Sequence, residues 1–199
     1  MSKNLLITGA SRGIGRATAL LAAAQGWTVG VNYREDRAAA DAVVAQIQAA
    51  GGQAVALQGD VAIEADVQRL FEAMDALGPL QGLVVNAGIV APPLPLLDMS
   101  GERLRRMFEV NVLGSYLTAR EGARRMARSR GGAGGSMVLV SSVAASLGSP
   151  FEYVDYAGAK GAMDVLTRGL AKELGGEVWF PKAKLRTAKL VSLFCVTSR

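Results

Sequence analysis

Five short apolar segments alternate with helix-like segments along this 199-residue chain, and this alternation restricts its fold more than any other feature. The predicted strands are residues 5–7, 28–33, 53–59, 80–85 and 137–140. The predicted helices are residues 16–25, 36–50, 63–77 and 101–130, and a last one that carries Tyr156 and ends near residue 174. Strands joined through helices lie parallel in one sheet, and right-handed crossovers place helices on both faces. The sequence therefore predicts a doubly wound, three-layer α/β fold.

The first strand leads into a glycine turn, with Gly9, Gly13 and Gly15 ahead of a helix. Glycine permits the tight turn and lets backbone N–H groups approach a pyrophosphate at the positive end of the helix dipole. The other residues expected at this ligand are Ser11, Arg12 and Ile14. An ordinary β–α loop is the alternative, but three glycines at a strand-to-helix junction favour a Rossmann-like, dinucleotide-binding domain.

The end of the second strand bears on which dinucleotide is bound. An NAD site usually has an Asp or Glu there to bond the ribose 2′-hydroxyl, whereas this chain has Asn32-Tyr33-Arg34. Arg34, together with Arg12, can neutralise a 2′-phosphate, so we expect NADP(H) to be preferred over NAD(H). Glu35 and Asp36 follow directly and argue the other way.

Two further strand ends carry candidate cofactor residues. Asp60 and Val61 follow the third strand, where a carboxylate can meet an adenine amino group; the alternative is that Asp60 caps the helix over 63–77. The fourth strand ends in small residues that let a cofactor lie against the backbone, namely Asn86, Ala87 and Gly88. Ligands of such sheets bind beyond the carboxyl ends of the strands, where all these residues fall.

Tyr156 and Lys160 are four residues apart on a predicted helix and therefore share one face. The ammonium favours the phenolate and lowers the pKa of the tyrosine from about 10, so the phenol can exchange a proton with a carbonyl or alcohol oxygen.

Ser142 lies at the end of the fifth strand. Asn111, buried in a helix, must find hydrogen-bond partners, so it is either structural or holds a water.

The composition excludes several kinds of site. The chain has no histidine, which removes Ser-His-Asp and Cys-His nucleophiles and the usual zinc sites, so we expect no metal. The single cysteine, Cys195, allows no internal disulfide and suits a reducing, cytoplasmic compartment. No apolar run has the length of a membrane span, and the first residues are too few for a signal peptide.

The net charge of +5 belongs to the last residues of the chain. Residues 178–199 contain five basic residues and no acidic one, and the other 17 basic and 17 acidic residues cancel. A further basic stretch consists of Arg103, Arg105, Arg106, Arg120, Arg124, Arg125, Arg128 and Arg130. We interpret this stretch as a solvated helix surface and expect no nucleic-acid partner.

Together these residues resemble the short-chain dehydrogenase/reductase family. Its cofactor turn T-G-x-x-x-G-x-G is matched by Thr8, Gly9, Gly13 and Gly15, and its N-A-G motif by Asn86, Ala87 and Gly88. Its tetrad of Asn, Ser, Tyr and Lys is matched by Asn111, Ser142, Tyr156 and Lys160. The chain is most similar to sugar dehydrogenases and 3-oxoacyl-carrier-protein reductases.

The resemblance implies hydride transfer between a nicotinamide and the carbonyl or alcohol carbon of a small molecule. It implies that Tyr156 is the general acid or base, that Lys160 also bonds the nicotinamide ribose, and that both residues contact the bound cofactor. It further implies that Ser142 stabilises the substrate oxygen and that Asn111 holds a water. Ser141 and Tyr153 are set aside, because the second serine matches the motif and residue 157 is not a lysine.

The resemblance covers about residues 3–176. The family continues with a sixth strand, a Pro-Gly turn, a substrate-covering segment, a helix and a seventh strand, and none of these motifs occurs over 178–199. We therefore expect a Rossmann-like domain over 1–177 with incomplete C-terminal strands, and an atypical or truncated basic tail over 178–199. One hypothesis pairs 191–197 as a strand in the sixth position.

Three functions follow for the chain. It is an NADP(H)-dependent oxidoreductase, a nucleotide-binding protein impaired by the missing substrate lid, or a poorly folding fragment without function. In the first two cases we expect a homodimer or homotetramer formed through the two long helices, over 101–130 and 156–174.

Overall fold

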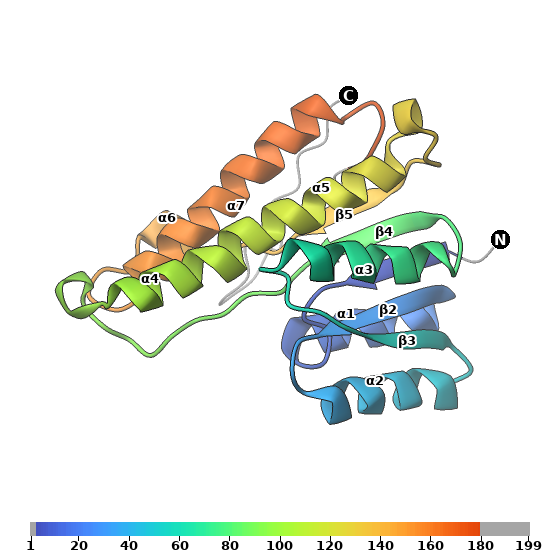
Figure 1. The fold of residues 1–199 in the computed structure, drawn as a ribbon, viewed down its shortest axis with the longest axis horizontal. Helices are drawn as coiled ribbons and strands as arrows, with labels where there is room; N and C mark the ends of the chain where they lie inside the picture. Colours follow the sequence, from blue (N-terminus) through green and yellow to red (C-terminus); the bar gives the residue numbers. More distant parts are fainter. Residues whose placement is uncertain (1–2, 180–199) are drawn as a thin grey trace.

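The computed structural model describes residues 3–179, and its centre is one sheet of five parallel strands in the order β3-β2-β1-β4-β5 (Figure 1). The strands are β1 (Lys3–Ile7), β2 (Trp27–Tyr33), β3 (Gln53–Gln58), β4 (Leu80–Val85) and β5 (Ser136–Leu139). Each pairs in parallel with its neighbours. The chain winds from β1 outward to β3 and then crosses to β4 and β5 on the other side, so the predicted doubly wound sheet is confirmed.

Helices cover both faces of the sheet and complete three layers (Figure 1). On one face lie α1 (Gly13–Ala24) and α2 (Arg37–Ala49); on the other lie α3 (Glu64–Asp75), α5 (Gly114–Met126) and α7 (Val154–Glu173). The shorter elements are η1 (Leu96–Asp98), α4 (Gly101–Phe108), the π-helical turn η2 (Glu109–Leu113), η3 (Arg128–Arg130) and α6 (Ala144–Leu147). No helix among residues 3–179 is both long and apolar enough to cross a membrane.

The alternation of side chains along the strands divides the core into two halves. Leu5 and Ile7 of β1 are buried in the cluster that contains the inner faces of α1 and α2. Leu6, between them, is buried in the opposite cluster with Phe71 and Met74 of α3. Because both faces of the sheet are covered, the strands are mostly apolar, as is typical of parallel sheets.

The helix predicted over 101–130 is divided in the structure. It consists of α4, the π turn η2 and α5, and α5 ends at Met126, four residues before the predicted end. The glycine-rich segment after it folds back, because the N–H groups of Gly132 and Gly134 donate to the carbonyls of Ala127 and Met126. A Cβ on Gly132 would lie 2.4 Å from the Arg125 carbonyl oxygen, so only glycine permits this approach.

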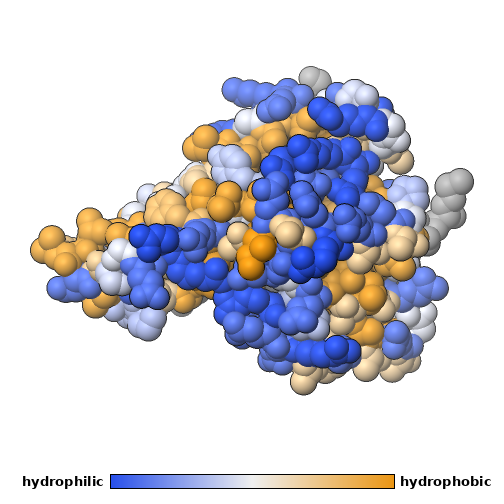
Figure 2. All heavy atoms as spheres, viewed as in Figure 1, coloured by the Kyte–Doolittle hydropathy of each residue, from blue (hydrophilic) through white to orange (hydrophobic). Residues whose placement is uncertain are grey.

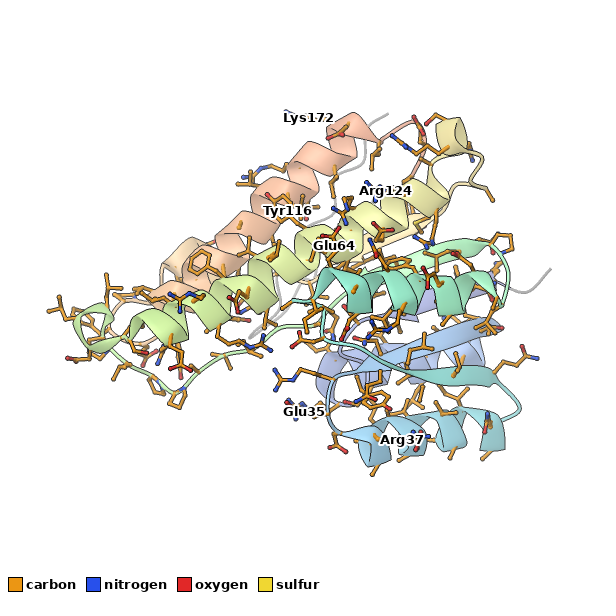
Figure 3. The ribbon with its side chains drawn as sticks, viewed as in Figure 1. Glu35, Arg37, Glu64, Tyr116, Arg124 and Lys172 are labelled. Carbon is orange, nitrogen blue, oxygen red and sulfur yellow. The ribbon has the colours of Figure 1, made fainter. Side chains whose placement is uncertain are left out.

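The arginine-rich stretch is mostly engaged in ion pairs. Five of its eight arginines have carboxylate partners, in the pairs Arg103–Asp155, Arg106–Asp60, Arg120–Glu64, Arg124–Glu121 and Arg125–Asp75. Figure 3 shows Glu64 at the start of α3 and Arg124 on the neighbouring α5. Three of these pairs connect different helices, namely Arg103–Asp155, Arg120–Glu64 and Arg125–Asp75, which is more specific than the solvated surface that the sequence predicted.

The last described residues lie beside the open edge of the sheet. The Trp179 N–H donates to the Gly135 carbonyl at 2.8 Å, and the Trp179 carbonyl accepts from the Met137 N–H at 3.0 Å. Trp179 thereby forms a parallel bridge with Ser136 of β5, in the position where a sixth strand would begin. The predicted basic tail from residue 180 onward, and the hypothetical strand over 191–197, lie outside the described residues.

Candidate active site

A pocket of about 330 Å³ lies beyond the carboxyl ends of the first four strands, where the strand order reverses between β1 and β4. Ten of the predicted cofactor residues line it: Gly9, Ser11, Arg12, Ile14, Arg34, Asp60, Val61, Asn86, Ala87 and Gly88. Eight further residues complete the lining: Asn32, Tyr33, Glu35, Asp36, Gly59, Ile89, Arg106 and Val110. Gly13, Gly15, Tyr156 and Lys160 lie outside this lining.

The glycine turn has a backbone geometry that favours glycine. Gly9 and Gly13 have positive φ angles of 63° and 58°. A Cβ on Gly15 would lie 2.5 Å from the Gly9 carbonyl oxygen and 2.7 Å from Asn86 Nδ2, so glycine is required there for close packing of α1 against the strands. The first turn of α1 has no side-chain cap and no acidic residue, which leaves its N–H groups and dipole available to an anion.

Two polar side chains hold the turns around the pocket together. Thr8 Oγ1 accepts hydrogen bonds from the N–H groups of Asn86 and Ala87, both at 3.0 Å. Asn32 Oδ1 accepts from the Gly9 N–H at 3.1 Å, and its Nδ2 donates to the carbonyls of Leu57 and Gly59. Asn32 is 2% exposed, so its amide fixes the backbone and is closed to a ribose hydroxyl.

The acidic residues near Arg34 are already engaged. Asp36 caps α2, with its carboxylate accepting from the Ala39 N–H at 2.9 Å. Glu35 forms an ion pair with Arg34, and Figure 3 shows it at the turn between β2 and α2. Arg34 also lies 3.9 Å from the Asp60 carboxylate, and nearly half of its side chain is exposed to the pocket and solvent.

Asp60 is held from two sides at the end of β3. One of its carboxylate oxygens accepts from the Ala62 N–H at 2.9 Å, and the other accepts from Arg106 Nη2 at 2.8 Å. Burial raises the pKa of Asp60, but the Ala62 N–H and the Arg106 guanidinium outweigh it and hold the pKa below its usual value. The capping alternative is wrong, since Ile63 occupies the N-cap of α3.

Asn111 lies fully buried in the π turn η2. Its amide exchanges two hydrogen bonds with the backbone of Ile89, accepting from the N–H and donating to the carbonyl, both at 2.9 Å. A Cβ on Gly88 would lie 2.6 Å from Asn111 Oδ1 and 3.5 Å from Lys160 Nζ, so these three residues converge. Asn111 therefore has a structural role; a part in holding a water stays a prediction.

Lys160 is 4% exposed, and its ammonium is the buried cation nearest the pocket's Gly88 corner among the described residues. Its Nζ donates to the Val140 carbonyl at 2.9 Å and lies 5.7 Å from the centre of the Tyr156 ring. Burial lowers the pKa of Lys160 from 10.5 to about 8, against the opposing charge of Asp164. Tyr156 is half-buried one turn earlier on α7.

Both serines after β5 are buried, but they bond differently. Ser141 Oγ donates to the Lys160 backbone carbonyl at 3.2 Å, which ties α7 to the end of the strand. Ser142 Oγ accepts from the Ala144 N–H at 3.2 Å and keeps its own hydrogen for another partner. The Ser142 hydroxyl is therefore the one of the two that can still donate, and its role at the substrate stays a prediction.

No cluster of three or more potential metal ligands occurs within residues 3–179. The residues present do fit a dinucleotide. An uncapped helix N-terminus suits a pyrophosphate, a pocket between strand ends has room for an adenosine, and glycines stand where Cβ atoms would fill the cradle. Fold and site together define a dinucleotide-binding α/β protein.

Comparison with known proteins identifies the family. Residues 3–178 match the family described as short chain dehydrogenase, and the chain belongs to it. Members are NAD(P)(H)-dependent dehydrogenases and reductases of carbonyl and CH–OH groups in small molecules, and this is the class of enzyme to which the chain is assigned.

Three similar proteins show the extent of the likeness. An uncharacterized oxidoreductase of Escherichia coli, YgfF, is 50% identical over 173 residues, which are 86% of this chain and 70% of that protein. A 3-oxoacyl-[acyl-carrier-protein] reductase of Synechocystis is 40% identical over 85% of this chain and 67% of its own. The crystal structure of a dehydrogenase/reductase from Sinorhizobium meliloti matches with a TM-score of 0.83 and 31% identity, over 90% of this chain and 70% of its own.

Proposed function

We propose that the chain is an NADP(H)-dependent oxidoreductase that interconverts a ketone or aldehyde and an alcohol. Bound NADP(H) supplies or accepts the hydride. The Tyr156 phenol gives the proton to the substrate oxygen or takes it away. Lys160 stabilises the phenolate and bonds the ribose of the nicotinamide, and Ser142 Oγ donates its hydrogen to the substrate oxygen. The Asn111 amide fixes the strand end against which the cofactor lies.

The observation that carries this proposal is the environment of Lys160. A lysine is rarely buried without a reason, because removing an ammonium from water is unfavourable. Here one is buried between Gly88 and the Tyr156 ring, at the corner where the dinucleotide pocket ends. Such a perturbed cation beside a phenol supports an acid–base role.

The preference for NADP(H) is supported by the charges around the pocket. Neither acidic residue after β2 is free for a ribose 2′-hydroxyl, because Asp36 caps α2 and Glu35 pairs with Arg34. Arg34 and Arg12 both line the pocket and offer positive charge to a 2′-phosphate. We expect Arg34→Asp to lower the affinity for NADPH about tenfold and to raise that for NADH. If a fluorescence titration showed an unchanged preference between NADPH and NADH, Arg34 would not be the residue that recognises the 2′-phosphate.

The second candidate function is nucleotide binding without turnover. Beside the site, the apolar side chains of Leu97, Leu147 and Phe151 are 96%, 68% and 80% exposed. Figure 2 shows hydrophobic residues gathered at the end of the molecule where α4 projects. A substrate pocket needs a wall that excludes water, and no such wall covers these residues within 3–179.

The proposed oligomer rests on a second apolar surface, on the outer side of α4, η2 and α5. Phe108, Leu113 and Tyr116 are each more than two-fifths exposed there, and Figure 3 shows Tyr116 on the open face of α5. A copy of this chain would cover that surface, and sedimentation would show a dimer or tetramer. We place the protein in the cytoplasm, because its single Cys195 suits a reducing compartment.

The experiment measures NADPH oxidation with ethyl acetoacetate, which contains a 3-oxoacyl group like the one named for the Synechocystis relative, and with a panel of ketones and sugars. NADPH binding is titrated in parallel. Binding with turnover supports the first function, and binding without turnover on any substrate supports the second. A chain that binds neither NADPH nor NADH contradicts both and indicates a poorly folded fragment.

A further inference from the structure

Arg103 of α4 and Asp155 of α7 form an ion pair that is almost closed to water. The Arg103 side chain is 13% exposed and that of Asp155 is 0% exposed. Arg103 Nε donates to Asp155 Oδ2 at 2.8 Å, and Nη2 donates to Oδ1 at 3.3 Å. Two parallel hydrogen bonds between planar groups fix direction as well as distance, so this pair sets how the two helices lie against each other.

The pair reaches the backbone of Tyr156 directly. Asp155 Oδ1 accepts from the Tyr156 N–H at 2.9 Å. The N-cap residue Tyr153 makes no side-chain cap, and Asp155 is the acidic residue of the first turn of α7. Asp155 therefore serves as the anchor for the start of the helix, and Arg103 holds that anchor in place.

The same guanidinium fastens the segment that follows β4. Arg103 Nη1 donates to the Pro92 carbonyl at 2.6 Å, and two residues later the Leu94 N–H donates to the Glu152 carbonyl. One arginine thus joins α4, the segment around Pro92 and the start of α7. These are the parts of the site that the sheet does not support, since α4 and the first turns of α7 extend past the strand ends (Figure 1).

The chain directly ahead of Tyr156 is partly exposed to solvent. Phe151 is 80% exposed, and Tyr153 and Val154 are only partly buried. Lys160, one turn later, is held by the Val140 carbonyl at the end of β5. In the helical turn from Tyr156 to Lys160, the Lys160 side chain is thus held by the end of β5. The Tyr156 backbone is held by Asp155, which is in turn paired with Arg103.

We propose that Arg103 and Asp155 are positioning residues that set the place of the Tyr156 phenol for proton transfer. The inference rests on the proposed function of Tyr156 and adds to it two residues that touch neither substrate nor cofactor. Neither Arg103 nor Asp155 lines the pocket, so we expect their loss to change kcat more than the affinity for NADPH.

An effect on the position of Tyr156 can be separated from an effect on stability by removing the charges of Arg103 and Asp155 singly and together. Removing one partner leaves a buried, unpaired charge and destabilises the fold, whereas removing both avoids that penalty. We expect Arg103→Met to lower both stability and turnover. We expect the double variant Arg103→Met/Asp155→Asn to recover most of the stability, since the amide that replaces the carboxylate keeps an acceptor for the Tyr156 N–H. Its kcat should nevertheless stay about 10²-fold below the parent's.

Two further variants complete the set. Arg103→Lys keeps the positive charge but cannot form the two parallel hydrogen bonds of the guanidinium. We expect its kcat to lie between those of the parent and the double variant. The matched control is Arg125→Met, which removes another partly buried arginine whose partners are Asp75 and Glu121 on α3 and α5. It should lower stability and leave kcat within about twofold.

The measurements are urea unfolding, NADPH affinity by fluorescence, and kcat and KM with ethyl acetoacetate. A loss of kcat in the double variant, with NADPH affinity within about twofold of the parent's, supports the inference. A double variant with a parental kcat would overturn it, as would an equal loss in Arg125→Met.

If the parent binds NADPH but does not turn over, the proposed catalytic function fails. Hydrogen exchange then tests whether Arg103 and Asp155 hold the segment around Tyr156 in place. Amides over 154–160 should exchange about tenfold faster in the double variant than in the parent, and those over 164–172 should be unchanged. Equal exchange over 154–160 in the two proteins would overturn the inference independently of any activity.

Discussion

The buried ammonium of Lys160 makes a quantitative prediction for stability as a function of pH. The pKa of Lys160 is lowered by burial from 10.5 to about 8 in the folded chain. Below pH 8 the lysine is charged in both states, and the unfavourable burial of its charge is fully present. Between pH 8 and 10.5 the folded chain releases the proton while the unfolded chain keeps it, so stability rises through this range.

The size of the rise follows from the two pKa values. Each pKa unit corresponds to about 1.4 kcal/mol, so Lys160 should add about 1.4 kcal/mol of stability between pH 7 and 9 and about 2.5 kcal/mol between pH 7 and 10. Other groups also titrate in this range, so the quantity to follow is the difference between the parent and Lys160→Met. Replacing Asp164 by Asn removes the opposing charge and should move the rise to lower pH.

Urea unfolding at pH 7, 8, 9 and 10 provides the free energies of unfolding. The free energy of unfolding of the parent should rise relative to that of Lys160→Met by the amounts given above. The matched control is Lys172→Met, which repeats the chemical change at the exposed C-terminal end of the same helix (Figure 3). A parent–variant difference that stays constant within about 0.5 kcal/mol from pH 7 to 10 would refute the argument that burial weakens this ammonium.

Three other substitutions test the packing of the site and its scaffold. Gly88→Ala should lower stability by about 1–3 kcal/mol and reduce turnover, because its Cβ would lie 2.6 Å from Asn111 Oδ1; unfolding and NADPH oxidation measure both effects. Gly169→Ala should raise stability by about 0.5–1 kcal/mol, because no atom lies within 4 Å of the new Cβ on α7, and a lower melting temperature would contradict this. Glu121→Ala should lower stability by about 2 kcal/mol at pH 7, since Arg124 and Arg125 lose their shared carboxylate. The Glu121 pKa is raised by burial but lowered further by those arginines, so this cost should shrink as the pH falls through it, and a cost that does not depend on pH would exclude the ion-pair explanation.

The sequence predicts the fold well, because local features decide it. Apolar strand segments, helical periodicity and the glycines at 9, 13 and 15 each follow from short-range sterics and hydrogen bonding. The alternation of these elements leaves few topologies, and right-handed crossovers select among them. The sheet order and the pocket at its reversal follow from these rules.

Among the eight lining residues that were not predicted to bind the cofactor, Asn32 and Arg106 have roles that depend on contacts distant in sequence. Asn32 was treated only as the absence of an acidic residue, although a polar side chain at the end of a buried strand signals a need for partners. Its amide bonds the turns after β1 and β3. Arg106 is one of eight similar arginines, and only the folded chain shows that it holds Asp60, 46 residues earlier.

The sequence also did not predict that the helix over 101–130 is divided. A π turn adds one residue to a helical turn and shifts the apolar pattern after it, but one such shift beside a helix as short as α4 is too small a signal to recognise in the sequence. Here it carries Asn111, whose amide must reach Ile89. The helix end at Met126 likewise depends on a glycine segment packing back onto it, which a count of helix-forming residues does not detect.

The most direct test of the account compares the parent with Tyr156→Phe. The rate of NADPH oxidation with the best substrate of the panel is measured beside the affinity for NADPH. We expect both proteins to bind NADPH equally, and the variant to turn over at least about 10²-fold more slowly, because only the proton donor is lost. A variant that binds NADPH and turns over as fast as the parent would show that the Tyr156 phenol does not carry the proton.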